Sequence, residues 1–241
     1  MLATGTPREL GLDPHRWASA LNLIETWCAE GELPAAGVMV VRGGRSTEPR
    51  HFGRQTLAAD SRPIRRDAIF LIASITKPIV AAGALLLVER GRITLDDCVE
   101  EYVPEFGREG KRTVTIRNLL THTSGLPDML ANNVALRAAN SPLSEFVAGA
   151  CACRLDFPPG RGVQYQSMGF ALLGEIIRRV SGTTCAQFLD DELFRPLGMN
   201  DTALGAPAAW FEGPHPKAER ITEVQAPENS EMSGEDRKSV V

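Results

Sequence analysis

The sequence FLIASITKP, residues 70–78, places Ser74 three positions before Lys77 at the start of a long apolar segment. Apolar residues at helical spacing continue as far as Gly91, which predicts a largely buried helix over 74–91 that ends at the glycine. Because residues i and i+3 share a helix face, we expect the Lys77 ammonium beside the Ser74 hydroxyl. This S-x-x-K arrangement is typical of an activated serine nucleophile. A helix-capping Ser74 with a solvated Lys77 is the alternative that the motif alone leaves open.

The chain before this segment predicts a helix followed by a β-hairpin. Apolar residues at three- and four-residue steps favour a helix over 14–28, with Asp13 as its N-cap. The valine-rich stretch 36–42, the glycine pair at 43–44 and a weaker strand over 51–57 have the outline of a hairpin. Two strands alone are marginal, so this sheet needs further strands.

The chain after Leu95 favours helices and loops. Helices are expected over four segments, which are 116–120 with Thr115 as cap, 142–150, 168–180 closed by Gly182, and 185–193. Only 219–225 offers a further strand, and the residues past Ala226 have the polar composition of an unpacked tail.

Composition limits the class of protein and its partners. Of the 241 residues, 43% are hydrophobic and 23% are charged, as in soluble globular proteins. The net charge of −4 gives no basic excess, so we expect no nucleic-acid partner. No apolar run reaches the about 18 residues that span a bilayer, and no export signal opens the chain. We therefore expect no membrane partner and a cytoplasmic location.

The cysteines and histidines do not indicate a metal or a cofactor. The five cysteines are scattered and odd in number, which favours reduced thiols. Cys151 and Cys153 are separated by one residue, whereas structural zinc sites usually have two to four between ligands. The four histidines do not cluster. Small buried hydrophobes are the better interpretation of Cys151 and Cys153, and we expect neither metal nor cofactor.

Four further motifs accompany FLIASITKP in a fixed order. They are ERGRITLDD at 89–97, LLTHTSGLP at 119–127, YQSMG at 165–169 and LFRPLGMNDT at 193–202. In this order and spacing, the chain resembles the serine β-lactamase and penicillin-binding-protein superfamily. The similarity is to its class C-like branch, which includes family VIII-like esterases and D-aminopeptidases, and it runs from about Leu10 to Thr202.

This resemblance implies a β-lactamase/transpeptidase-like fold of the α/β plus all-α class. An antiparallel sheet is flanked by helices and joined to a helical subdomain. We expect one domain over 1–235, in which 1–73 form the αββ part of the sheet region and 74–235 the helical region. Residues 236–241, DRKSVV, match a reading frame of a sequencing adapter and are expected to be a non-native tail.

The resemblance also implies roles for three residues. Ser74 is the nucleophile, Lys77 the cation beside it, and Tyr165 the phenol that acts as base and then as acid. A phenol with an ordinary pKa near 10 is a poor base at pH 7, so a neighbouring cation must stabilise the phenoxide. Whether Lys77 or Tyr165 accepts the proton stays open. For Tyr165, an amphipathic core residue with a satisfied hydroxyl is the alternative.

The second motif departs from the family's Tyr-x-Asn, because Ser167 stands where asparagine is common. A serine cannot make the same two contacts, to a substrate amide carbonyl and to Lys77, so ester substrates are favoured over β-lactams. Ser167 is a candidate substrate-binding residue, and the N-cap of the helix over 168–180 is an equally weighted alternative. His122 and Ser124 belong to a loop that is mostly architectural in the family.

The third motif, a Lys-Thr-Gly or His-x-Gly triplet, is absent after Thr202. We therefore expect a C-terminally truncated chain that lacks sheet strands and is inactive as given. The full protein is expected to be a serine hydrolase for small ester, amide or β-lactam substrates. A non-turnover penicillin-binding or sensor-like module is the alternative. No G-x-S-x-G or H-E-x-x-H occurs, which excludes α/β-hydrolase and zinc-hydrolase motifs.

Overall fold

The computed structural model describes residues 2–58, 60–214 and 216–223. These form two compact units, of which unit 1 comprises residues 2–71 with 206–223 and unit 2 comprises residues 72–205. The expected single domain over 1–235, with an αββ part over 1–73 and a helical part over 74–235, stays a prediction. The expected tail at 236–241 lies outside the described residues. Within the described part of the chain, no helix is long and apolar enough to cross a membrane.

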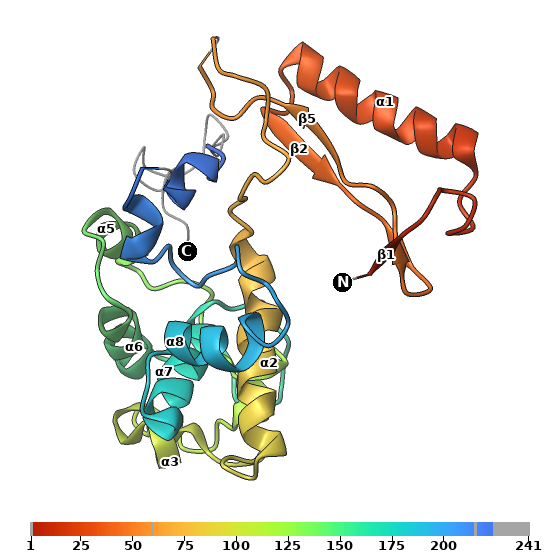
Figure 1. Ribbon diagram of the computed structural model, residues 1–241. Coiled ribbons are helices and arrows are strands. Elements are labelled where there is room, and N and C mark those ends of the chain that lie inside the picture. The colour runs from red at the N-terminus through yellow and green to blue at the C-terminus, as the bar shows by residue number, and fades with distance from the viewer. Residues whose placement is uncertain (1, 59, 215, 224–241) are drawn as a thin grey trace. The chain divides into compact units, whose positions relative to one another are not determined.

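Unit 1 begins with the expected helix, α1 (Pro14–Glu30), which follows the short strand β1 (Ala3–Thr4). The Asp13 side chain accepts hydrogen bonds from the main-chain N–H groups of His15 and Arg16, which confirms it as the N-cap. In Figure 1, α1 lies along the strands β2 (Ala35–Val38) and β5 (Arg50–Gly53). Leu21 is the one buried residue of this helix.

The hairpin has its expected outline but is divided into two short ladders. β2 pairs antiparallel with β5, and β3 (Val41–Arg42) pairs antiparallel with β4 (Arg45–Ser46) across the glycine turn. β1 adds to β4 in parallel, which the sequence did not indicate. The strand expected over 36–42 is therefore interrupted at residues 39–40, and the weaker strand expected near 51–57 spans 50–53. Between the ladders, the Val40 N–H donates to the Thr47 hydroxyl at 3.0 Å, so a side chain replaces a ladder partner.

The end of β5 needs a glycine at position 53. Gly53 has a φ of +85°, and a Cβ there would lie 2.3 Å from the Pro34 carbonyl oxygen. The backbone therefore approaches more closely than any side chain allows. This close approach ends the ladder at the pair Ala35 and Gly53 and turns the chain away.

The last described residues of unit 1 form one isolated β-bridge and no strand. They form the 3₁₀ turns η4 (Ala208–Phe211) and η5 (Lys217–Arg220). Ile221 then bridges Ile69 in parallel, and the Gln55 amide donates to the carbonyls of Arg220 and Ile221 at 3.0 and 3.1 Å. The strand expected over 219–225 is thus one bridge in its described part, because the chain reaches it from a 3₁₀ turn.

Unit 2 is helical, as expected. Its elements are η1 (Ala73–Ile75), α2 (Thr76–Glu89), α3 (Val99–Tyr102), η2 (Pro104–Phe106), α4 (Ile116–Leu120), α5 (Asn133–Ala138), α6 (Leu143–Ala152), α7 (Met168–Ser181), α8 (Cys185–Leu189) and the π-helical η3 (Asp190–Phe194). Thr115 caps α4, and α7 ends at Gly182, as the sequence indicates. The helix expected over 185–193 changes from α to π geometry after Leu189.

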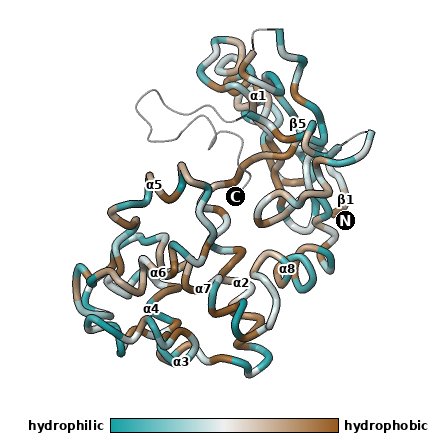
Figure 2. The backbone as a smooth tube through the Cα atoms, turned by 90° about the vertical axis from the view of Figure 1, so that its left-hand side faces the viewer, coloured by the Kyte–Doolittle hydropathy of each residue, from teal (hydrophilic) through white to brown (hydrophobic). Residues whose placement is uncertain are grey.

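The core of unit 2 lies around α7, which contacts α2, α4, α6 and α8. Figure 2 shows the hydrophobic stretches of α2 and α7 within this unit. The fully buried aliphatic side chains include Leu119, Leu172, Leu173 and Ile177. Burial of this kind is the main favourable contribution to folding, at about 25 cal/mol per Å² of apolar surface. Unit 2 therefore carries a closed core of its own.

Two buried ionic groups are embedded in unit 2. The fully buried Lys111 ammonium donates to the Cys153 carbonyl at 2.6 Å and lies 5.5 Å from the Phe106 ring centroid. The buried Glu175 carboxylate accepts hydrogen bonds from Arg178 and Arg179 on the next turn of α7, at 2.8 and 2.6 Å. The hydrogen bond from Arg178 and then that from Arg179 lower the pKa of Glu175 to about 2.

The five cysteines are free thiols, as expected. Cys185 is buried, and the other four are half-buried rather than fully buried. In the described residues, no group of three or more His, Cys, Asp or Glu side chains is placed to hold a metal ion.

Candidate active site

Ser74 lies in η1, the single turn that leads into α2. Its side chain is exposed. The preceding residue, Ala73, has a φ of +45°, which is uncommon for a residue with a Cβ. Such backbone strain persists only where the surrounding structure enforces it, and it concentrates at functional sites. Nothing in the sequence singled out Ala73.

Lys77 lies in the first turn of α2, on the same face as Ser74. Its ammonium donates to the Ser74 hydroxyl oxygen at 3.2 Å, which is the contact expected from the S-x-x-K spacing. The same Nζ lies 4.5 Å from the ring centroid of Tyr165 and 5.8 Å from that of Phe170. Two aromatic faces therefore flank the half-buried cation.

Tyr165 comes from the loop before α7 and completes the group. Its hydroxyl donates to the Ser74 oxygen at 2.7 Å, across 91 positions of sequence. The residue is 48% exposed, so the core-residue alternative is wrong. The hydrogen bonds with Lys77 and then Ser74, together with the Lys77 charge, lower the pKa of Tyr165, against burial and the Asp128 charge. A phenol with a lowered pKa is better suited to proton transfer near neutral pH.

His122 fixes the loop that carries Tyr165. Its carbonyl accepts from the Gln164 N–H at 2.9 Å, and its Nδ1 accepts from the Gln166 N–H at 3.2 Å. Its ring lies 4.9 Å from the Tyr165 ring. Burial, and then the Lys77 charge, lower the pKa of His122, which suits the neutral, accepting imidazole seen here. These contacts position Tyr165 from both sides.

Sequence reasoning missed Gln166, which anchors the same loop from beneath. This buried side chain donates to the Leu119 carbonyl at 3.1 Å and accepts from the Gly169 N–H at 2.7 Å. A Cβ at position 169 would lie 2.4 Å from both polar atoms of the amide, so any larger residue would displace the amide from this position. That glycine, three residues after Gln166, is the one signal in the sequence that points to this packing.

Ser167 occupies the N-cap position of α7 without capping it. Its backbone is helical, with φ −87° and ψ −29°, and its side chain makes no capping hydrogen bond. The hydroxyl instead donates to Oδ1 of Asp128 at 2.9 Å. The N-cap alternative for Ser167 thus holds for its position but not for its side chain, because a carboxylate 39 residues away in the sequence takes the hydroxyl. Asp128 was also missed by sequence reasoning.

The side chains of Ser74, Lys77 and Tyr165 thus converge on one oxygen, in the order of motifs that prompted the resemblance. A family model described as Beta-lactamase matches residues 20–230. The chain belongs to the beta-lactamase family.

Relatives within and beside this family carry several names. The chain is 33% identical over 175 residues to a penicillin-binding protein of Bacillus subtilis (strain 168), covering 68% of this chain and 37% of that protein. It is 34% identical over 211 residues to the esterase EstB of Burkholderia gladioli, covering 81% of this chain and 53% of EstB. This beta-lactamase-family chain therefore spans between a third and just over half the length of these relatives.

Solved structures of the family support the fold. A family VIII carboxylesterase aligns with a TM-score of 0.70 and 26% identity, covering 87% of this chain and 54% of the esterase. The expected β-lactamase/transpeptidase-like fold is confirmed by this similarity, as is the expected relation to penicillin-binding proteins and esterases.

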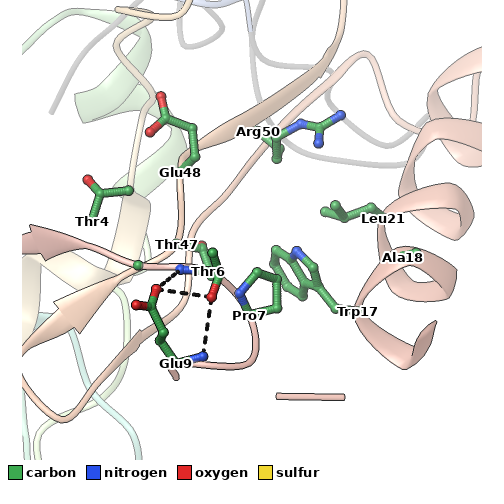
Figure 3. Close-up of a pocket in the computed structure, with 11 residues that line it drawn as sticks. Thr4, Thr6, Pro7, Glu9, Trp17, Ala18, Leu21, Thr47, Glu48 and Arg50 are labelled. Atoms are coloured by element: carbon green, nitrogen blue, oxygen red, sulfur yellow. Dashed lines mark hydrogen bonds between the residues drawn. The ribbon is translucent and has the colours of Figure 1, made fainter. Parts of the chain in front are cut away.

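A hollow of about 580 Å³ is lined by residues of unit 1 alone. Figure 3 shows Trp17 and Leu21 of α1 on one side of it and Glu9 on another. The Glu9 carboxylate already accepts the Thr6 N–H and hydroxyl hydrogens, at 2.7 and 3.0 Å. Because these hydrogen bonds occupy the Glu9 carboxylate, and because Ser74, Lys77 and Tyr165 do not line the hollow, we assign it no role in this beta-lactamase-family chain.

Proposed function

We propose that the protein is a serine hydrolase that acts by acyl transfer through an ester on Ser74. The observation that carries this proposal is the convergence of the Tyr165 hydroxyl and the Lys77 ammonium on the Ser74 oxygen, at 2.7 and 3.2 Å. A nucleophile and a proton-transfer group within hydrogen-bond reach, with a cation beside both, form the arrangement that covalent catalysis requires.

The proposed reaction moves one proton between Ser74 and Tyr165. As the phenoxide of Tyr165, held by Lys77, takes the Ser74 proton, the serine oxygen attacks the substrate carbonyl and a tetrahedral oxyanion forms. The Ser74 N–H is one donor to that oxyanion. Collapse breaks the bond to the leaving group, which takes the proton from Tyr165. Water then attacks the acyl-serine as Tyr165 takes a proton from it, and the bond to Ser74 breaks as Tyr165 returns that proton to the serine oxygen and the acid is released.

We assign the base role to Tyr165 because its pKa is lowered by the hydrogen bonds with Lys77 and Ser74 and by the Lys77 charge. The assignment leaves Lys77 charged throughout, so its ammonium stabilises the phenoxide before attack and orients the Ser74 oxygen. His122 keeps the phenol in place through its ring contact.

The proposed substrates are small esters or amides, with esters preferred over β-lactams. The similarity to EstB and to a family VIII carboxylesterase supports this preference. Ser167 in place of the family's asparagine supports it as well. We propose no metal, cofactor, nucleic-acid or membrane partner. The cytoplasmic location expected from the sequence stays a prediction.

We further propose that the 241-residue chain has little or no turnover on its own. The family resemblance implies a second oxyanion donor beside a Lys-Thr-Gly or His-x-Gly triplet. The sequence has no such triplet after Thr202. Loss of one such donor lowers kcat by about 10² to 10³. Acylation without release would instead support the penicillin-binding or sensor-like alternative.

Intact-mass analysis tests the assignment of Ser74. After treatment with a fluorophosphonate, we expect one adduct per chain, and none in Ser74→Ala. Retention of the adduct in Ser74→Ala would contradict the assignment. Comparing kcat/KM for p-nitrophenyl butyrate and nitrocefin then tests the ester preference, which a clear preference for nitrocefin would reverse.

A further inference from the structure

Asp128 binds Ser167 at three points. The Ser167 hydroxyl donates to Asp128 Oδ1 at 2.9 Å, and the Ser167 N–H donates to the same oxygen at 2.8 Å. The Ser167 N–H also lies 3.2 Å from the Asp128 carbonyl oxygen. Main chain and side chain are therefore held together, and the main-chain contact does not depend on the carboxylate.

The hydroxyl contact decides what Ser167 can offer a substrate. A serine hydroxyl carries a single hydrogen, and an ionised carboxylate can only accept. Hydrogen bonds to a charged acceptor are about twice as strong as neutral ones. The hydroxyl hydrogen of Ser167 therefore remains directed at Asp128. To any other partner, the Ser167 oxygen presents only its lone pairs.

We propose that Asp128 is a specificity-determining residue, because by taking the only hydroxyl hydrogen of Ser167 it leaves that side chain unable to donate to the amide carbonyl of an acylamino substrate. The inference rests on the proposed acyl-transfer function and deepens it. The substrates it favours are esters with plain hydrocarbon acyl groups. An acylamino group would place its carbonyl oxygen against lone pairs and lose a hydrogen bond from water.

Two substrates with one leaving group isolate this effect. p-Nitrophenyl pentanoate and p-nitrophenyl N-acetylglycinate have acyl chains of the same length, and only the second contains an amide. The measurement is the rate of Ser74 acylation, followed by p-nitrophenol release in a single turnover and by intact mass. It uses the whole 241-residue chain and does not require fast turnover. The readout is the rate of acylation by the amide-containing ester divided by the rate of acylation by the plain ester.

Variants at the two positions make a cycle with a distinct pattern. Asp128→Ala frees the Ser167 hydrogen, and we expect the ratio to rise about three- to tenfold. Ser167→Ala should leave the ratio at the wild-type value, since the hydrogen is already unavailable. The double variant should return to that value. Asp156→Ala is the matched control, because Asp156 accepts from Gln164 on the same loop at 2.8 Å but does not contact Ser167.

Ser167→Asn gives an independent test if Asp128→Ala does not fold. A carboxamide has two N–H hydrogens, so one can stay on Asp128 while the other faces the substrate, and the ratio should rise. The proposal is overturned if neither variant raises the ratio, or if Ser167→Ala lowers it. Absence of any Ser74 adduct in the wild type overturns the proposed function itself, and is distinguished by the missing adduct.

Discussion

The two units of the molecule differ in how many residues their long helices bury. α7 buries eight residues, Met168, Gly169, Leu172, Leu173, Gly174, Glu175, Ile176 and Ile177, whereas the longer α1 buries only Leu21. α1 also leaves Leu23 49% and Trp27 36% exposed. Ser74, Lys77 and Tyr165 all belong to the unit with the closed core. The comparison indicates that the geometry of the candidate site depends on unit 2, while unit 1 has little core to resist local opening.

The largest effect is expected at the phenol of unit 2. Tyr165→Phe keeps the ring that contacts His122 and Lys77 but removes the proton-transfer group, so kcat should fall by about two to four orders of magnitude. Circular dichroism should show unchanged folding. Near-normal turnover in this variant would assign the proton transfer to Lys77 or to another residue.

A matched pair of leucines tests the difference in burial directly. Leu172→Ala removes a fully buried side chain of α7 and should lower the free energy of unfolding by about 2 to 5 kcal/mol. Leu23→Ala removes a half-exposed side chain of α1 and should change it by less than about 1 kcal/mol. Urea titrations of both variants, followed by circular dichroism, measure the difference. Equal effects would mean that α1 is buried as deeply in solution as α7.

The tryptophans offer a probe of one unit alone, because Trp17, Trp27 and Trp210 all lie in unit 1. Tryptophan fluorescence should therefore change at a lower urea concentration than the helical circular dichroism, by about 1 M for a difference of about 1 to 3 kcal/mol. Fluorescence and circular dichroism transitions at the same urea concentration would show that the units unfold together. That result would contradict the proposed difference in stability.

The smallest expected effect is a pH dependence in unit 2. The folded pKa of Glu175, about 2, lies below its ordinary value of 4.5, so the carboxylate stabilises the fold fully above 4.5 and loses this contribution as pH falls towards 2. With allowance for screening at half-exposed Arg178, the loss should be about 1 to 2 kcal/mol. Glu175→Gln should flatten the profile in this window, whereas Glu145→Gln, at an exposed position of α6, should not. An unchanged profile in Glu175→Gln would contradict the assignment.

The sequence predicted the features that local patterns encode. Asp13, Thr115 and Gly182 mark helix ends by chemistry that acts within a few residues, and the S-x-x-K spacing alone places Lys77 beside Ser74. The two ladders of the hairpin were not predictable, because their separation depends on Thr47 bonding to Val40. Asp128 and Ser167 meet across 39 positions, and no local pattern indicates such a pair.

The buried ammonium of Lys111 allows the opening of unit 2 to be followed by chemical modification. An amine with no exposed surface cannot react with an acylating reagent until the surrounding helices open. The half-buried Lys77, by comparison, reaches the exposed Ser74 oxygen and should be modified early. Peptide mass mapping can follow acetylation of Lys77 and of Lys111 separately. The delay between the two reactions therefore reports how fast the helical core opens, and the experiment needs no added label.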